Sequence, residues 1–194
     1  PFLENVLDIV INNDNLREFI KDINYNCDCN YDYNAAYVFT SKILKFNITN
    51  ILEDAKRGFS LRKRAYELGT NISDLEKYIY LSLTFILTAL HELEHVRQVK
   101  TLETTHENTF EKILIQNSLD ILSINPDFYE KKYNLFPIER MANINSTGKL
   151  IEMLRLDNDF SSFANKNFNN EYEWAITQYY IYGRMPLLEY INVT

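Results

Sequence analysis

Two histidines and a glutamate carry the chemistry that this sequence suggests. His91, Glu92 and His95 form the pattern His-Glu-x-x-His, and only one other histidine, His106, occurs in the chain. In an α-helix, residues four positions apart lie about 40° apart on one face, so both imidazoles can bind one metal ion. Glu92 lies beside that pair and can reach a metal-bound water. The spacing therefore predicts a metal site with Glu92 as general base.

The alternative interpretation is a pair of buried histidines without a metal. The motif lies among three leucines, Leu87, Leu90 and Leu93. Burying two imidazoles and a carboxylate among such side chains costs free energy unless another group compensates. A metal ion supplies that compensation, so we favour the metal site.

Helical periodicity sorts the neighbours of the motif into two faces. Thr84, Thr88 and Gln98 share the face of the two histidines, and we expect them to line the site. We expect Glu94 on nearly the opposite face, in contact only with solvent.

A tetrahedral zinc site needs a third protein ligand. The metzincin pattern, with a histidine six positions after His95, is excluded because Thr101 stands there. His106 and a downstream carboxylate remain. On an unbroken helix His106 would lie about 16 Å from His95, and a capping box from Thr104 would place it in the first turn of a new helix. Glu139 requires only that two helices pack side by side, so it is the better candidate.

The segment Glu139-Arg-Met-Ala-Asn143 follows Pro137, a residue that favours the start of a helix. Together with the first motif, it resembles the gluzincin group of zinc metallopeptidases, above all the short ImmA/IrrE-type peptidases and minigluzincins. The resemblance covers residues 91–143. It implies that Glu139 is the third zinc ligand and that Asn143 supports one histidine ligand through a hydrogen bond.

The same resemblance implies an activity. His91 and His95 would bind Zn²⁺ with Glu139, and Glu92 would act as general base in the hydrolysis of peptide bonds. Such sites usually add a second donor for the oxyanion, for which Tyr129 and Tyr133 are the candidates. A substrate peptide commonly pairs with an edge strand beside the active helix, and the segment from Tyr37 to Phe46 is the candidate strand.

Composition limits the class of protein. The 194 residues, 46% hydrophobic and 24% charged, predict a single globular domain over 1–194. A net charge of −7 argues against nucleic-acid binding. The apolar run 78–90 is too short to span a membrane, and the first residues lack the features of a signal peptide, which predicts a cytoplasmic protein. Because the chain begins with proline, we expect it to be trimmed or part of a longer protein. Cys27 and Cys29 cannot form a disulfide framework.

Four glycines, four prolines and long stretches of 3.6-residue periodicity predict a mainly α fold with a small β element (α+β). The resemblance implies a helical zincin-like domain around two motif helices. The expected helices cover residues 3–23 (with a break near 12–15), 48–68, 73–99, 104–122 and 137–156. Residues 36–46 are expected to form a strand or short hairpin, and 24–34 a loop. Residues 160–194 are expected to form an aromatic-rich segment that is helical until Gly183 and packs in the core.

The leading function is therefore a zinc-dependent peptidase that acts on a peptide or protein substrate, with no nucleic-acid or membrane partner. A non-catalytic metal-binding interaction protein is one alternative. A regulatory peptidase restricted to one protein partner is another. The oligomeric state stays open.

Overall fold

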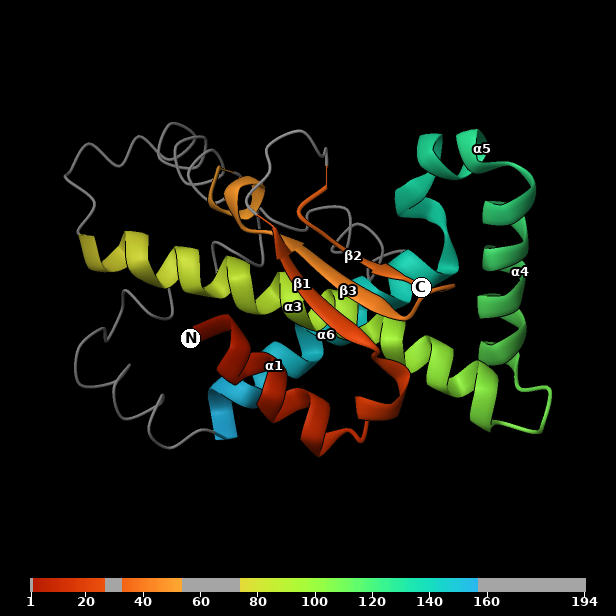
Figure 1. Cartoon of the computed structure of the whole chain (residues 1–194), viewed down its shortest axis with the longest axis horizontal. Coiled ribbons are helices and arrows are strands. Elements are labelled where there is room, and N and C mark those ends of the chain that lie inside the picture. Colours follow the sequence, from red (N-terminus) through yellow and green to blue (C-terminus); the bar gives the residue numbers. More distant parts are fainter. Residues whose placement is uncertain (1, 27–32, 54–73, 157–194) are drawn as a thin grey trace.

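The computed structural model describes residues 2–26, 33–53 and 74–156, which form helices around a small sheet (Figure 1). Its elements are α1 (Phe2–Asn13), the 3₁₀ turn η1 (Arg17–Phe19), β1 (Asp22–Asn26), β2 (Ala35–Val38), β3 (Ile43–Asn47), α3 (Asp74–Thr104), α4 (Phe110–Ile124), α5 (Pro126–Lys131), the 3₁₀ turn η2 (Tyr133–Leu135) and α6 (Pro137–Leu156). Residues 48–53 are also helical. The predicted mainly α fold with a small β element is confirmed.

The three strands are ordered β1-β3-β2, with β1 parallel and β2 antiparallel to β3. The hairpin predicted within 36–46 is confirmed as β2 and β3, and its turn ends at Lys42, whose φ is 57°. Among the described strands, β2 is an edge strand, and it packs against α3 (Figure 1). This contact brings the edge of the sheet to the helix that carries the histidine motif.

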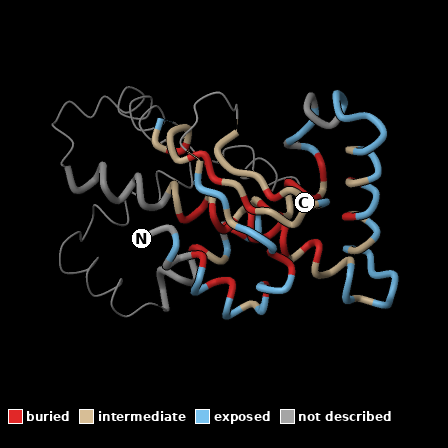
Figure 2. Tube along the Cα trace, viewed as in Figure 1, coloured by how far each residue is buried: buried red, intermediate tan, exposed pale blue. Residues whose placement is uncertain are grey.

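The main core joins α1, the sheet and the middle of α3 (Figure 2). Leu7, Val10 and Ile11 have the spacing of one helical face and bury that face of α1. Leu44 and Phe46 are two residues apart on β3, so their side chains lie on the same face of the sheet, and both are fully buried. The middle of α3, which carries the histidine motif, is buried from several sides.

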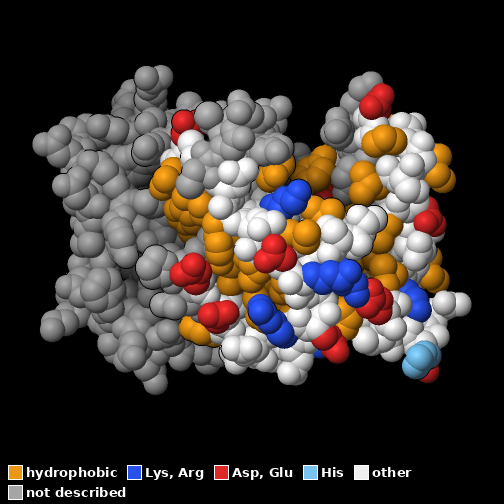
Figure 3. Space-filling view, in the orientation of Figure 1, with side chains coloured by type: hydrophobic (Ala, Val, Ile, Leu, Met, Phe, Trp, Pro, Cys, Tyr) orange, Lys and Arg blue, Asp and Glu red, His pale blue; other side chains and the backbone are white. Residues whose placement is uncertain are grey.

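A smaller core lies between α4 and the start of α6. Ile115 of α4 packs there with Phe136 and Ile138, which flank Pro137. This cluster fixes the first turn of α6, which carries Glu139. The outer side of α4 is exposed instead, and hydrophobic side chains such as Phe110 and Ile124 remain at that end of the molecule (Figures 2 and 3).

Two predicted helix boundaries are wrong. The first helix, α1, ends at Asn13, within the predicted break near 12–15. The continuation to Ile23 is wrong, because residues 22–26, expected as helix end and loop, form β1, where pairing with β3 satisfies their backbone. Thr104, predicted to start a helix, is instead the last residue of α3. The Thr104 hydroxyl donates to the Lys100 carbonyl at 2.8 Å. The cap of α4 is Thr109, whose side chain accepts from the backbone N–H of Lys112 at 3.2 Å.

Two further predicted helices are confirmed, and some predictions concern residues that the structure does not describe. The helix predicted over 137–156 is confirmed at both ends, and the long helix predicted over 73–99 is confirmed with a later end at Thr104. Cys27, Cys29, the helix expected over residues 54–68 and the aromatic segment 160–194 lie outside the described residues. No helix in the described ranges has both the length and the hydropathy to cross a membrane.

Candidate metal centre

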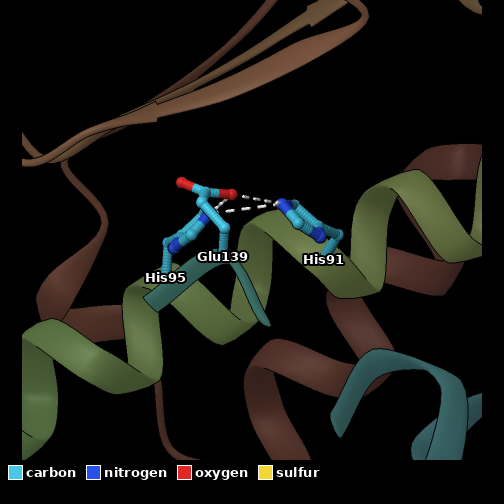
Figure 4. Close-up of side chains that lie close together, drawn as sticks. All are labelled: His91, His95 and Glu139. Carbon is cyan, nitrogen blue, oxygen red and sulfur yellow. Dashed lines mark hydrogen bonds and ion pairs between the residues drawn. The ribbon is translucent and has the colours of Figure 1, made fainter. Parts of the chain in front are cut away.

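Two helices bring three potential metal ligands together. His91 and His95 extend from the same face of α3, and Glu139 approaches them from the first turn of α6 (Figure 4). The Nε2 atoms of the two histidines lie 3.2 Å apart. Glu139 Oε2 lies 3.3 Å from Nε2 of His91 and 3.4 Å from Nε2 of His95. The three atoms therefore form a nearly equilateral triangle.

The other ring nitrogen of each histidine is bonded to an amide oxygen. Nδ1 of His91 lies 3.1 Å from Oδ1 of Asn143, and Nδ1 of His95 lies 2.9 Å from Oε1 of Gln98. An amide oxygen only accepts hydrogen bonds, so each Nδ1 carries the proton and donates. In the neutral rings the lone pairs are then on the Nε2 atoms, which face each other and Glu139.

The size of this triangle fits a small divalent cation. Ligand bonds of about 2.0–2.1 Å in a tetrahedron require neighbouring ligand atoms about 3.3 Å apart. The three observed separations lie between 3.2 and 3.4 Å. Two imidazole nitrogens and one carboxylate oxygen also form a donor set that divalent transition metals prefer. The group of His91, His95 and Glu139 could therefore bind a metal ion.

The site is enclosed but reachable from one side. The side chains of His95 and Glu139 are 5% and 4% exposed, whereas that of His91 is 14% exposed. The ring of Phe39, which follows β2, packs edge-on against His95 with centroids 5.7 Å apart. Access to the ligand atoms is therefore expected beside His91.

The carboxylate and the histidines perturb one another strongly. Burial lowers the pKa of His95, but the hydrogen bond and charge of Glu139 outweigh it and raise the pKa to about 9. Burial raises the pKa of Glu139, but the hydrogen bonds and charges of His91 and His95 bring it well below its usual range. The metal-free site thus holds a proton among the ligands, and a bound cation would take its place.

Glu92 occupies a different environment from Glu139. Its side chain is buried beneath the strand β2, and burial raises the pKa of its carboxyl. The charges of the two histidines oppose this effect, and the charge of Glu139 adds to it. A hydrogen bond from the backbone of Tyr37 lowers the pKa of Glu92. The same hydrogen bond shows that β2 lies directly beside Glu92. A buried carboxyl that holds a proton readily is suited to act as base and then as acid.

Of the two candidates for the third ligand, the structure brings only Glu139 to the histidine pair. His106 is exposed in the segment between α3 and α4. Tyr133 lies in η2, partly exposed, and the side chain of Tyr129 lies outside the described residues, so both remain predictions as oxyanion donors. Thr88 donates to the carbonyl of Thr84 within α3 at 2.8 Å.

The role assigned to Glu94 is wrong. Its side chain is not solvated but nearly fully buried, paired with Arg97 and bonded to Asn145 Nδ2 at 3.2 Å. The expected position opposite the histidines is also wrong, because helical spacing puts Glu94 about 60° from His91 and about 100° from His95, beside the histidine face. α1 and α6 cover that side of α3. The arginine three positions later was the signal available in the sequence, because residues at i and i+3 meet on a helix.

Known proteins give no independent guide to this site. Comparisons of the chain with protein-family models, with curated proteins and with solved structures found no match.

Proposed function

We propose that this protein is a zinc-dependent peptidase of the gluzincin type, built on a zincin-like arrangement of α3, α6 and the small sheet. The observation that carries the proposal is the convergence of two Nε2 lone pairs and one carboxylate oxygen at 3.2–3.4 Å from one another. His91, His95 and Glu139 would hold the zinc ion. Asn143 and Gln98 would keep the imidazoles in the tautomer that binds it.

Glu92 is the proposed catalytic base. When bound, zinc would polarise a carbonyl and lower the pKa of a water molecule towards neutrality. Glu92 would take a proton from the attacking water and return it to the leaving nitrogen. Its raised pKa favours the second of these transfers, because the protonated carboxyl is stable in its buried position.

The edge of β2 is the proposed site for the substrate backbone. The carbonyls of Asn34 and Val38 accept bonds from the Asn47 and Lys42 amides on the β3 side. By the alternation of an antiparallel pair, the backbone groups of Ala35 and Tyr37 point to the opposite edge. That edge faces Glu92, since the backbone of Tyr37 bonds to its carboxyl. An extended peptide added there would lie along the proposed catalytic groups.

Metal content and cleavage together test this function. The purified protein should contain one zinc ion per chain and cleave unfolded casein or a mixed peptide library. A chelator should abolish the cleavage, and added Zn²⁺ should restore it. Bound zinc without cleavage would instead support a non-catalytic metal-binding protein, and cleavage of one partner only would support a restricted peptidase. A protein that binds no divalent metal would overturn the proposal.

A further inference from the structure

Gln98 makes two hydrogen bonds that join the two halves of the candidate metal centre. It lies three residues after His95 on α3 and is only 3% exposed. Its Oε1 accepts from Nδ1 of His95 at 2.9 Å, and its Nε2 donates to the backbone carbonyl of Ile138 at 2.8 Å. Ile138 is the residue before Glu139. One side chain thus connects the second histidine to the backbone next to the carboxylate.

The two bonds require an amide at this position. Towards His95 the side chain must accept, because Nδ1 carries the proton, and towards Ile138 it must donate, because a carbonyl only accepts. The donation to Ile138 also fixes which end of the amide faces the histidine. A carboxylate of the same length could make the first bond but not the second. A methionine of similar length could make neither.

We propose that Gln98 is a positioning residue that sets the distance between two metal ligands, His95 and Glu139. The inference rests on the proposed zinc site, and it assigns Gln98 a role that neither the His-Glu-x-x-His pattern nor the Glu139–Asn143 segment contains. His91 is held to α6 directly by Asn143. His95 is connected to α6 through Gln98 and the carbonyl of Ile138. Hydrogen bonds therefore connect both histidines to the helix that carries Glu139.

Loss of the two Gln98 hydrogen bonds should change the metal site more than the fold. α3 and α6 also pack through buried apolar residues, among them Ala142 and Leu150 of α6 and Leu93 of α3. Loss of the two Gln98 bonds leaves this packing in place. It frees the ring of His95 to rotate and lets the first turn of α6 shift, and both changes move ligand atoms.

The test compares three variants by zinc affinity against a competing chelator and by the visible spectrum of the Co²⁺-substituted protein, which reports the ligand geometry. Gln98→Met should weaken zinc binding by about 10–100-fold and change the Co²⁺ spectrum. Gln98→Glu keeps only the bond to His95, and its charge makes that ring a stronger ligand, so its effect is expected in the Co²⁺ spectrum, which should lie between those of Gln98→Met and wild type. The control is Asn145→Ala, which removes another hydrogen bond between α3 and α6 without touching a ligand. It should leave the affinity and the spectrum unchanged.

Several results would overturn the proposal. One is wild-type zinc affinity in a folded Gln98→Met protein, and another is equal losses in Gln98→Met and Asn145→Ala, which would indicate helix packing alone. A wild-type Co²⁺ spectrum in Gln98→Glu would remove the role of the Ile138 carbonyl. None of these readouts uses peptide cleavage. A protein that binds zinc but cleaves nothing therefore fails only the proposed function, whereas one that binds neither metal fails both.

Discussion

The long helix α3 carries a polar cluster on each of two faces, and the two clusters are completed in different ways. The first consists of His91, His95, Glu139 and Glu92. The second consists of Asp14, Glu94, Arg97 and Lys149, with Arg97 paired to both acids and Lys149 3.4 Å from Asp14. The second cluster pairs two acids with two permanent cations. It ties α1, α3 and α6 together with the chain's own charges.

The first cluster has no such balance. The charges that act on its two buried carboxyls come from one another and from the histidines. A histidine is cationic only when protonated, and here protonation would place a hydrogen where the two Nε2 atoms and Glu139 converge. A cluster balanced by permanent charges is explained by stability alone, whereas a cluster balanced only by a proton on a histidine can exchange that proton for a metal ion. Substitutions on the two faces should therefore affect different properties.

The largest expected contrast is between two neighbouring glutamates. Glu92→Gln should lower the rate of peptide cleavage by about 10²–10⁴-fold, because it removes proton transfer but no metal ligand. Its zinc content should stay at the wild-type level. Glu94→Gln, on the other face, should lower the unfolding temperature and keep the cleavage rate of the folded protein. Equal rates for Glu92→Gln and wild type would exclude Glu92 as the base.

The next contrast concerns the third ligand. Glu139→Gln should weaken zinc binding by at least about tenfold, because it removes a charged ligand. His106→Ala should bind zinc as wild type does, since His106 is exposed between α3 and α4. Titration of both variants with Zn²⁺ against a competing chelator measures the difference. The reverse ranking would leave only the His-Glu-x-x-His pattern in support of a metal.

In the second cluster, Arg97→Met should cost stability instead of activity. It leaves Glu94 buried without its cation, and an unsatisfied buried charge costs about 1–3 kcal/mol or more in the free energy of unfolding. Urea denaturation measures this loss, and zinc affinity of the folded variant should match wild type. A large loss of zinc affinity with little loss of stability would show that the two faces are not independent.

The sequence predicted the convergence of His91, His95 and Glu139 better than it predicted the elements around them. Motif spacing places His91 and His95 on one face of any helix, and Pro137 sets the start of α6 and hence the position of Glu139. These are local rules. β1 was missed although Ile23 and Tyr25 alternate with polar residues, because the segment is short and its aspartate and asparagines are uncommon in strands. Pairing with the neighbouring strand β3 makes it a strand. The burial of Glu94 was missed because the elements that cover it, α1 and α6, are distant in sequence.

The smallest expected effect is a pH dependence of the metal-free protein. Although burial lowers the pKa of His95, Glu139 raises it overall from 6.5 to about 9. A histidine whose pKa rises on folding adds stability that is complete below about pH 6.5 and is lost as the pH rises through about 9. The raised pKa of Glu92 changes stability in the same direction with pH. The lowered pKa of Glu139 adds stability that is lost only in acid, outside this window.

The unfolding temperature of the metal-free protein should therefore fall between pH 6.5 and 9, and differential scanning calorimetry after chelation measures it. Arg97→Met should unfold at lower temperature but keep this slope, whereas His95→Gln should flatten it, because the slope belongs to the histidine face of α3. Zinc binds the unprotonated imidazole, so the stabilisation by added Zn²⁺ should increase over the same range. A metal-free protein whose unfolding temperature is constant or rises from pH 6.5 to 9 would contradict a proton shared between His95 and Glu139.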